Sequence, residues 1–174
     1  ICCINLILFL KKIQLLSYLL IIPSLITKGF LPDFFLSLTT LLFIFFSIFE
    51  RNFALYKDKF FIFLIIWNLY LIILSILSDN ILLSLESSLF YFRFTFFILA
   101  TQYILMNNNN IFKYLFVSIL LPFVLLISDS YFQYFNGSNI LGYPYLGDRL
   151  SSFFKDEFVL GSYLSRLLPL FFVF

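Results

Sequence analysis

Long apolar blocks separated by short polar turns run through the whole chain. A helix needs about 20 mostly apolar residues to cross the hydrocarbon core of a bilayer. By that measure the pattern predicts five complete transmembrane spans and the start of a sixth. The predicted spans lie at about 13–26, 34–49, 60–77, 88–106 and 111–132, and the sixth begins at about 160.

The apolar blocks lack the strict alternation of apolar and polar residues that membrane-crossing barrel strands show. Helices are then the remaining way to satisfy the backbone hydrogen bonds within a bilayer. We therefore expect an all-α fold, a polytopic transmembrane helical bundle. Pro122 is tolerated inside the fifth span because neighbouring helices can satisfy the freed carbonyl. The stretch SDNILLSLESS, residues 78–88, has a spacing that allows an amphipathic helix at the bilayer surface.

The composition agrees with a membrane protein. Hydrophobic residues make up 63% of the 174 residues and charged residues only 11%, whereas a soluble domain carries about 25% charged residues. No internal repeat is visible, so residues 1–174 are expected to form a single transmembrane domain. The sequence opens on Ile1, without a start methionine, and stops at Phe174 within an apolar run, which reads as a fragment of a longer protein.

Charge and side-chain chemistry exclude several functions. The formal net charge of +2 is too small and too dispersed for a nucleic-acid partner. The chain has no histidine, and Cys2 and Cys3 are adjacent rather than spaced as metal ligands. We expect no metal and no cofactor.

The placement of lysine and arginine predicts the orientation. Most of these residues fall on the side of the amino terminus, which the positive-inside rule makes cytoplasmic; they are Lys11, Lys12, Arg51, Lys57, Lys59 and Lys113. The short loops on the other side offer only Lys28. The long loop at about 134–160 then faces outward; in a Gram-negative bacterium this means that the loop is periplasmic and that the protein lies in the inner membrane. Arg149 and Lys155 in that loop carry less weight, because the rule applies to short loops.

Three ionisable residues lie within the predicted spans, near their outer ends. Arg93 is about five residues, or ~7 Å, from the end of the fourth span, and Asp129 and Arg166 are placed at a comparable depth. Such residues are costly in a membrane and indicate a functional site unless they pair. An Arg93–Asp129 ion pair that only fixes helix packing, or an arginine reaching outward to the interface, remains the structural alternative.

Arginine predicts a phosphate ligand, because the guanidinium group presents a fixed fork of donors that fits phosphate oxygens. Three arginines would meet near the outer face, which suits a pyrophosphate carried on a lipid. Gln133 follows Asp129 by four residues and shares its helix face, so both are expected partners for sugar hydroxyls. Asp156 and Glu157 are adjacent and would point about 100° apart on a helix, so they would not share a proton. The candidate substrate-binding residues are Arg93, Asp129, Gln133, Arg149, Asp156, Glu157 and Arg166.

The chain resembles the amino-terminal part of the O-antigen ligase and polymerase family of bacterial polytopic membrane proteins, over most of its length in topology and specifically from about Asp129 onward. The stretches DSYFQYFNGSNILGYP and RLSSFFKDEFVLGSYLSRLLPL carry the resemblance. In that family an aspartate and a glutamine end a span, and a Gly-containing turn, an arginine and a hydroxyl pair follow. The matching positions are Asp129, Gln133, Gly137, Gly142, Arg149, Ser151, Phe153, Asp156, Glu157, Gly161 and Pro169. The family often has glycine where this chain has Ser152, and SLFYFRF around Arg93 is similar to its earlier arginine-bearing span.

The resemblance implies a membrane glycosyltransferase that takes polysaccharide from undecaprenyl pyrophosphate. Ligases pass it to the lipid A core, whereas polymerases pass it to another repeat unit. The family is regarded as metal-independent, with a histidine in a later periplasmic loop as the base, so no catalytic residue is expected here. A transporter or flippase of a lipid-linked or anionic solute is the alternative from another class, although transporters place their charges nearer the bilayer midplane.

Overall fold

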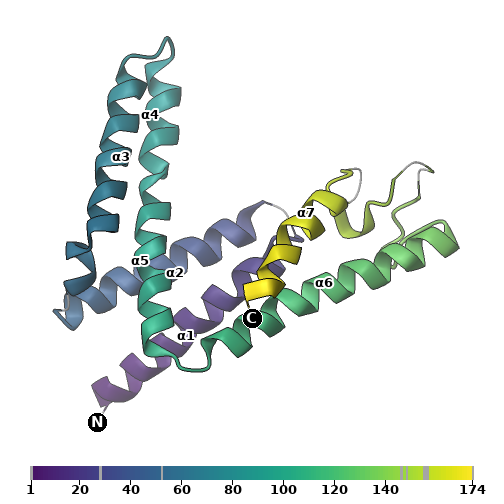
Figure 1. Cartoon of the computed structure of the whole chain (residues 1–174), viewed down its shortest axis with the longest axis horizontal. Coiled ribbons are helices and arrows are strands. Elements are labelled where there is room, and N and C mark those ends of the chain that lie inside the picture. The colour runs from purple at the N-terminus through teal and green to yellow at the C-terminus, as the bar shows by residue number, and fades with distance from the viewer. Residues whose placement is uncertain are drawn as a thin grey trace. The chain divides into compact units, whose positions relative to one another are not determined.

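In the computed structural model the chain is built from α-helices and short 3₁₀ helices (Figure 1). The structure describes residues 2–27, 29–51, 53–145, 147, 149–154 and 157–173. Within those residues the β structure is one isolated antiparallel bridge between Ser138 and Pro144. The helices are α1 (Cys2–Ser24), α2 (Phe30–Phe49), η1 (Ala54–Lys57), α3 (Lys59–Ile76), α4 (Ile81–Phe90), α5 (Phe92–Asn107), α6 (Ile111–Asn136), η2 (Ser152–Phe154), α7 (Leu160–Leu167) and η3 (Leu168–Val173).

Among the residues that the structure describes, five helical stretches are long and apolar enough to cross a membrane, which confirms the all-α polytopic fold predicted from the sequence. They are Leu6–Ser24, Phe30–Phe49, Lys59–Ile76, Ile81–Asn107 and Ile111–Asn136. Many of their large apolar side chains are exposed, among them Leu41, Ile48 and Phe63. Such surfaces are costly in water but fit a lipid environment. The sixth predicted span corresponds to α7, which begins at Leu160 as expected, and to the 3₁₀ turn after it.

The fourth span differs from the prediction at its start. It begins at Ile81 rather than at about 88. The reason is that α4 packs along α3 instead of lying apart from it (Figure 1). Helix α4 then leads directly into α5, and Tyr91 is the one residue between α4 and α5. Ser84 faces α3 and accepts a hydrogen bond from Ser78 at 2.8 Å. The stretch expected to lie apart at the bilayer surface is therefore one arm of a helical hairpin.

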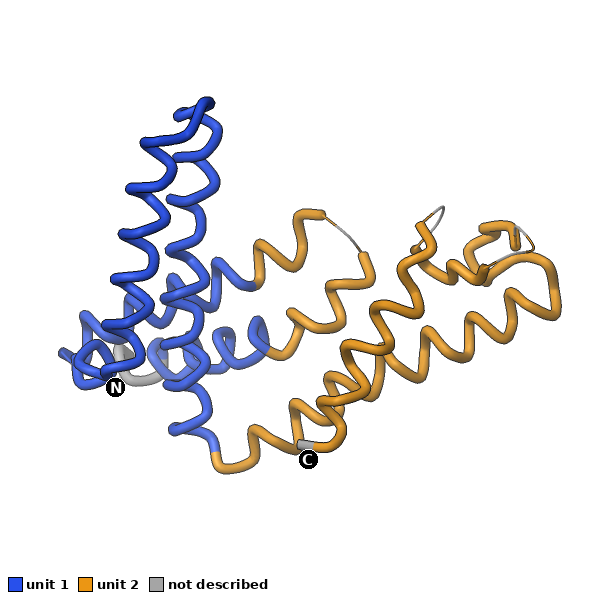
Figure 2. The backbone as a smooth tube through the Cα atoms, turned by 45° about the horizontal axis from the view of Figure 1, so that its top comes forward, with its two compact units in different colours: residues 1–18, 36–108 blue, residues 19–35, 109–174 orange. Residues whose placement is uncertain are grey.

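The chain divides into two compact units (Figure 2). The first contains residues 1–18 and 36–108, and the second contains residues 19–35 and 109–174. Each unit is described below by itself. The single transmembrane domain expected from the sequence stays a prediction.

Aromatic and aliphatic side chains fill the core of the first unit. Phe43, Phe61, Leu99 and Ala100 are buried together and bring α2, α3 and α5 into contact. A polar contact accompanies them, because Asn68 of α3 donates a hydrogen bond to the Thr95 hydroxyl of α5 at 2.7 Å. The Asn68 amide also donates to the carbonyl of Leu64 at 2.7 Å.

The core of the second unit joins α6 to the segment that follows it. Leu126 of α6 packs with Phe154 and Leu160, and Leu150 lies against this cluster. Helix α6 continues unbroken through Pro122, which agrees with the expectation that a proline is tolerated there. The loop after α6 is thus folded back onto its own helix by apolar contacts.

Candidate functional site

The long helix α6 ends in a turn that reverses the chain. Its C-cap, Gly137, has a φ of +74°, a conformation that glycine adopts without steric cost. The amide of Asn139 then donates to the carbonyl of Tyr143 at 2.9 Å, and the amide of Tyr145 donates to the carbonyl of Gly137 at 2.7 Å. These bonds close a tight turn that directs the loop back toward the last turns of α6.

Asp129 binds this returning loop. Its side chain is 1% exposed. One carboxylate oxygen, Oδ1, accepts the backbone amide of Ile140 at 3.1 Å. The other, Oδ2, accepts the Ser152 hydroxyl and the Asn139 amide. The carboxylate of Asp129, which the sequence predicted to belong to a functional site, therefore accepts hydrogen bonds from three donors of its own unit.

Gln133 holds the same loop one helical turn further along, and it is fully buried. Its Oε1 accepts the backbone amides of Ser151 and Ser152, at 3.2 and 2.8 Å. Its Nε2 donates to the Ser151 hydroxyl at 3.2 Å and to the carbonyls of Tyr143 and Pro144 at 3.3 and 3.4 Å. Both ends of the amide are occupied by the loop.

Asn139 completes the arrangement from the loop side. Its Nδ2 donates to the carbonyl of Ser152 at 2.9 Å, and its Oδ1 accepts the amide of Tyr143 at 2.7 Å. We call the set Asp129, Gln133, Asn139, Ser151 and Ser152 the loop clasp. All five side chains are buried, so the hydrogen bonds of the loop clasp are shielded from competing water.

Ser152 has an unusual backbone within the loop clasp. Its φ is +49°, which lies in the left-handed region where a residue with a Cβ is strained by about 1–2 kcal/mol. Its amide donates to Gln133 and its hydroxyl donates to Asp129. These two bonds offset the strain and fix the chain reversal that leads into η2.

A pocket of about 360 Å³ opens beside the loop clasp, in the same unit. Two candidate residues line it, Glu157 and Arg166, together with Ser162 and Tyr163. Glu157 and Arg166 are both exposed, so the structure brings an acidic and a basic predicted residue to one accessible pocket. Its remaining walls are formed by Leu25, Phe154, Val159 and Leu167.

Tyr163 connects the pocket to the first helix of the chain. It lines the pocket, and its phenol donates a hydrogen bond to the carbonyl of Ile22 at 3.0 Å. This bond attaches α7 to the last turns of α1.

Arg149 lies at the surface just before the loop clasp. Its side chain is exposed, while the next two residues are fixed. Leu150 packs against the apolar core, and the amide of Ser151 binds Gln133. The Arg149 guanidinium group is therefore attached to an anchored backbone and is accessible to an anion in solution. Asp156, the remaining candidate of this loop, lies outside the described residues, as do Lys28, Asp148 and Lys155.

Arg93 belongs to the first unit, in the first turn of α5. Its guanidinium carbon is 5.0 Å from the centroid of the Phe94 ring, a cation–π distance. Because its span begins at Ile81, Arg93 lies 12 residues from that end, or ~18 Å rather than ~7 Å. Asp129 lies only seven residues from Asn136, or ~10 Å. The distance of Arg93 from the end of its helical stretch is thus longer than expected, while the equal depth and the convergence of the three arginines stay predictions.

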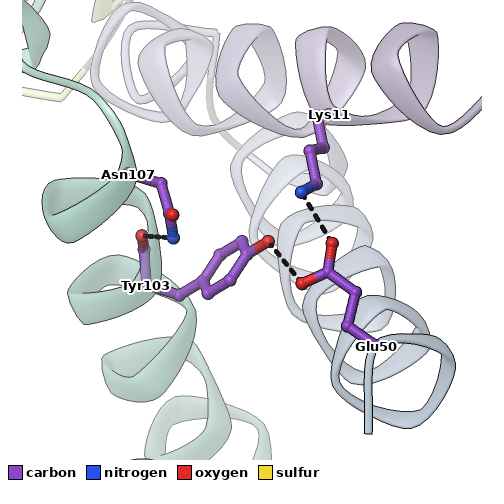
Figure 3. Close-up of polar contacts among 4 residues, drawn as sticks. All are labelled: Lys11, Glu50, Tyr103 and Asn107. Carbon is purple, nitrogen blue, oxygen red and sulfur yellow. Dashed lines mark hydrogen bonds and ion pairs between the residues drawn. The ribbon is translucent and has the colours of Figure 1, made fainter. Parts of the chain in front are cut away.

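A second polar cluster lies in the first unit (Figure 3). Lys11 of α1 forms an ion pair with Glu50 at 2.6 Å, and the phenol of Tyr103 donates to the other oxygen of Glu50 at 3.3 Å. One turn after Tyr103, Asn107 donates to the Tyr103 carbonyl at 2.8 Å. The sequence analysis did not identify this cluster. Two features of the sequence could have indicated it. Lys11 lies within an apolar block and Glu50 directly follows the next apolar block, and the predicted topology places both residues at the same side of the membrane.

Within the described residues no group of three or more His, Cys, Asp or Glu side chains is placed to hold a metal ion. No family model, curated protein or solved structure matches the chain. The class is therefore defined by the fold and the clusters described above. The protein is a multi-pass α-helical membrane protein. A polar loop is bound to the end of α6, and an accessible pocket in the same unit is lined by one acidic and one basic side chain.

Proposed function

We propose that the chain is part of an O-antigen ligase-like enzyme that transfers polysaccharide from undecaprenyl pyrophosphate to the lipid A core at the periplasmic face. The observation that carries the proposal is that the second unit buries one set of candidate residues and exposes another. Asp129 and Gln133 are buried in the loop clasp, whereas Arg149, Glu157 and Arg166 are exposed in the same unit. A charged, anchored surface of this kind suits an anionic lipid headgroup.

The backbone of Ser152 adds support to the resemblance. The resembled family often has glycine at this position, and the φ of +49° is one that glycine adopts without strain. The same loop path is therefore compatible with the family's glycine. The aspartate and glutamine that mark the family pattern are the two α6 residues that hold this loop.

In the proposed reaction an acceptor hydroxyl attacks the sugar carbon bonded to the lipid diphosphate. The bond from that carbon to the diphosphate oxygen breaks, and negative charge develops on the departing diphosphate. Arg149 and Arg166 stabilise that charge, since preorganised donors act most strongly where charge appears in the transition state. The base that takes the hydroxyl proton lies outside these residues, as the resemblance implies. Asp129 and Gln133 act by positioning the loop.

A polymerase of the same family would use the same donor and differ only in its acceptor. A transporter or flippase of a lipid-linked or anionic solute is the second candidate, and one observation favours it. Arg93 lies near the middle of a 27-residue candidate span. Transport sites commonly place charged residues near the bilayer midplane.

Deletion of the gene in the bacterium that encodes it separates these functions. We expect full-length polymer to accumulate on the carrier lipid while the lipid A core stays bare. A core that carries a single repeat unit would instead assign polymerase activity. Lipid-linked repeat units retained at the cytoplasmic face would assign transport and contradict the transferase proposal.

A further inference from the structure

A pocket of about 280 Å³ lies between α1 and α5 of the first unit. Its walls combine apolar side chains with lysine and amide side chains, and its lining residues are Leu8, Lys11, Lys12, Gln14, Leu15, Tyr103, Ile104, Asn107 and Asn108. No acidic residue belongs to this lining. We propose that the pocket binds the headgroup of an anionic phospholipid.

Its position along the helices fits a lipid headgroup. Lys11 meets Glu50, the first residue after the candidate span of α2. It also approaches Tyr103, which lies four residues before the end of the α5 span. The pocket is therefore level with the ends of two spans, where phosphate groups lie in a bilayer. Leu15, one helical turn deeper in the α1 span than Lys11, is placed to contact the upper part of an acyl chain.

The charges of the pocket favour a singly charged anion. Glu50 balances one lysine, Lys11, through the ion pair of 2.6 Å, while Lys12 beside it is exposed. The net charge of Lys11, Lys12 and Glu50 is thus +1, which matches the phosphodiester of phosphatidylglycerol. Basic pockets between membrane helices are known to recognise such headgroups.

Lys11 is held in a fixed position before any ligand arrives. Its ammonium group lies 5.7 Å from the centroid of the Phe46 ring and 5.9 Å from that of Tyr103. Tyr103 in turn holds Glu50 (Figure 3). Because the Lys11 side chain is already ordered, binding a headgroup there costs less conformational entropy than at a free lysine. This inference needs only a membrane-embedded protein and does not depend on the proposed transferase activity.

Native mass spectrometry of the purified full-length protein tests the proposal. The probes are phosphatidylglycerol and phosphatidylcholine with matched acyl chains. We expect phosphatidylglycerol to bind at least about five-fold more tightly, and Lys12→Gln to reduce that binding about five-fold. Lys57→Gln is the matched control, because Lys57 is exposed in η1 and does not line the pocket. Equal binding of both lipids, or equal loss in both variants, overturns the proposal.

Two further arms test the charge argument and the identity of the ligand. Glu50→Gln removes the balancing charge, so it should tighten binding of phosphatidylglycerol, whereas weaker binding by the folded variant contradicts the argument. If that variant does not fold, the comparison of Lys12→Gln with Lys57→Gln decides. Glycerophosphoglycerol, which keeps the headgroup phosphodiester without acyl chains, should not compete with phosphatidylglycerol. Competition at equal concentration would assign the pocket to a free phosphate ester and overturn the lipid proposal.

Discussion

At the residue scale, Asp129 and Gln133 bind the loop that follows them. Their oxygen and nitrogen atoms meet backbone and side-chain groups of residues 139–152. Buried polar groups contribute to stability mainly because leaving a partner unsatisfied is costly. The two residues are therefore expected to act on the stability and position of the loop before they act on any substrate.

Asp129→Asn tests this role. The new amide group would point hydrogen atoms at the donors of Ser152 or Ile140, so one of them loses its acceptor. We expect the free energy of unfolding to fall by about 1–3 kcal/mol, measured by thermal unfolding in detergent, with faster proteolysis within the loop. Lys113→Gln, at an exposed position of the same helix and outside the loop clasp, serves as the control. An unchanged unfolding midpoint in Asp129→Asn would contradict the loop clasp.

Two substitutions of Ser152 distinguish the effect of backbone strain on stability from the effect of the side-chain hydrogen bond. Ser152→Ala loses the bond to Asp129 and keeps the positive φ, so its stability should fall by about 1–2 kcal/mol. Ser152→Gly loses the same bond but relieves strain of about 1–2 kcal/mol, so it should be nearly as stable as the natural chain. Thermal unfolding of both variants gives the order. A glycine variant less stable than the alanine variant would show that φ at this position is not strained.

At the element scale, the apolar blocks predicted the helices well because crossing a bilayer sets both their length and their composition. Helices α3 and α6 begin within one residue of the expected start. The hairpin of α3 and α4 was not predicted, because the serines of α4 have the same spacing on a surface helix as on a packed one. Asp129 and Gln133 were identified from the sequence, but their partners were not. Those partners depend on the path of the loop, which the periodicity of the helices does not encode.

The pairing of α3 with α5 depends partly on one interhelical hydrogen bond. Thr95→Val removes the acceptor of Asn68, and hydrogen bonds between membrane helices contribute about 0.6 kcal/mol and up to about 1.7. We expect a loss in that range in thermal unfolding. Thr40→Val is the matched control, because Thr40 is also buried and donates only to the Leu36 carbonyl of its own helix among the bonds described for it. Equal losses in the two variants would mean that the Asn68–Thr95 bond adds nothing to helix pairing.

At the scale of the whole molecule, orientation decides where the loop clasp and its pocket lie. Cys2 and Cys3 would first be replaced by serine, and one cysteine introduced at Leu141 or at Asn109, both exposed. An impermeant maleimide should label Leu141→Cys in intact cells and Asn109→Cys only after the inner membrane is opened, as the positive-inside rule predicts. The reverse labelling would place the loop in the cytoplasm and contradict a periplasmic reaction.

The most direct test of the proposed function is Arg149→Lys, expressed in the deletion strain. Lysine keeps the charge but lacks the paired donors of guanidinium, and Arg149 lies outside the loop clasp, so protein abundance should be unchanged. We predict that glycan transfer to the lipid A core falls on the order of 10–100-fold, measured from the lipopolysaccharide profile at matched protein levels. A profile equal to that of the natural chain would contradict the role of Arg149 at the donor diphosphate.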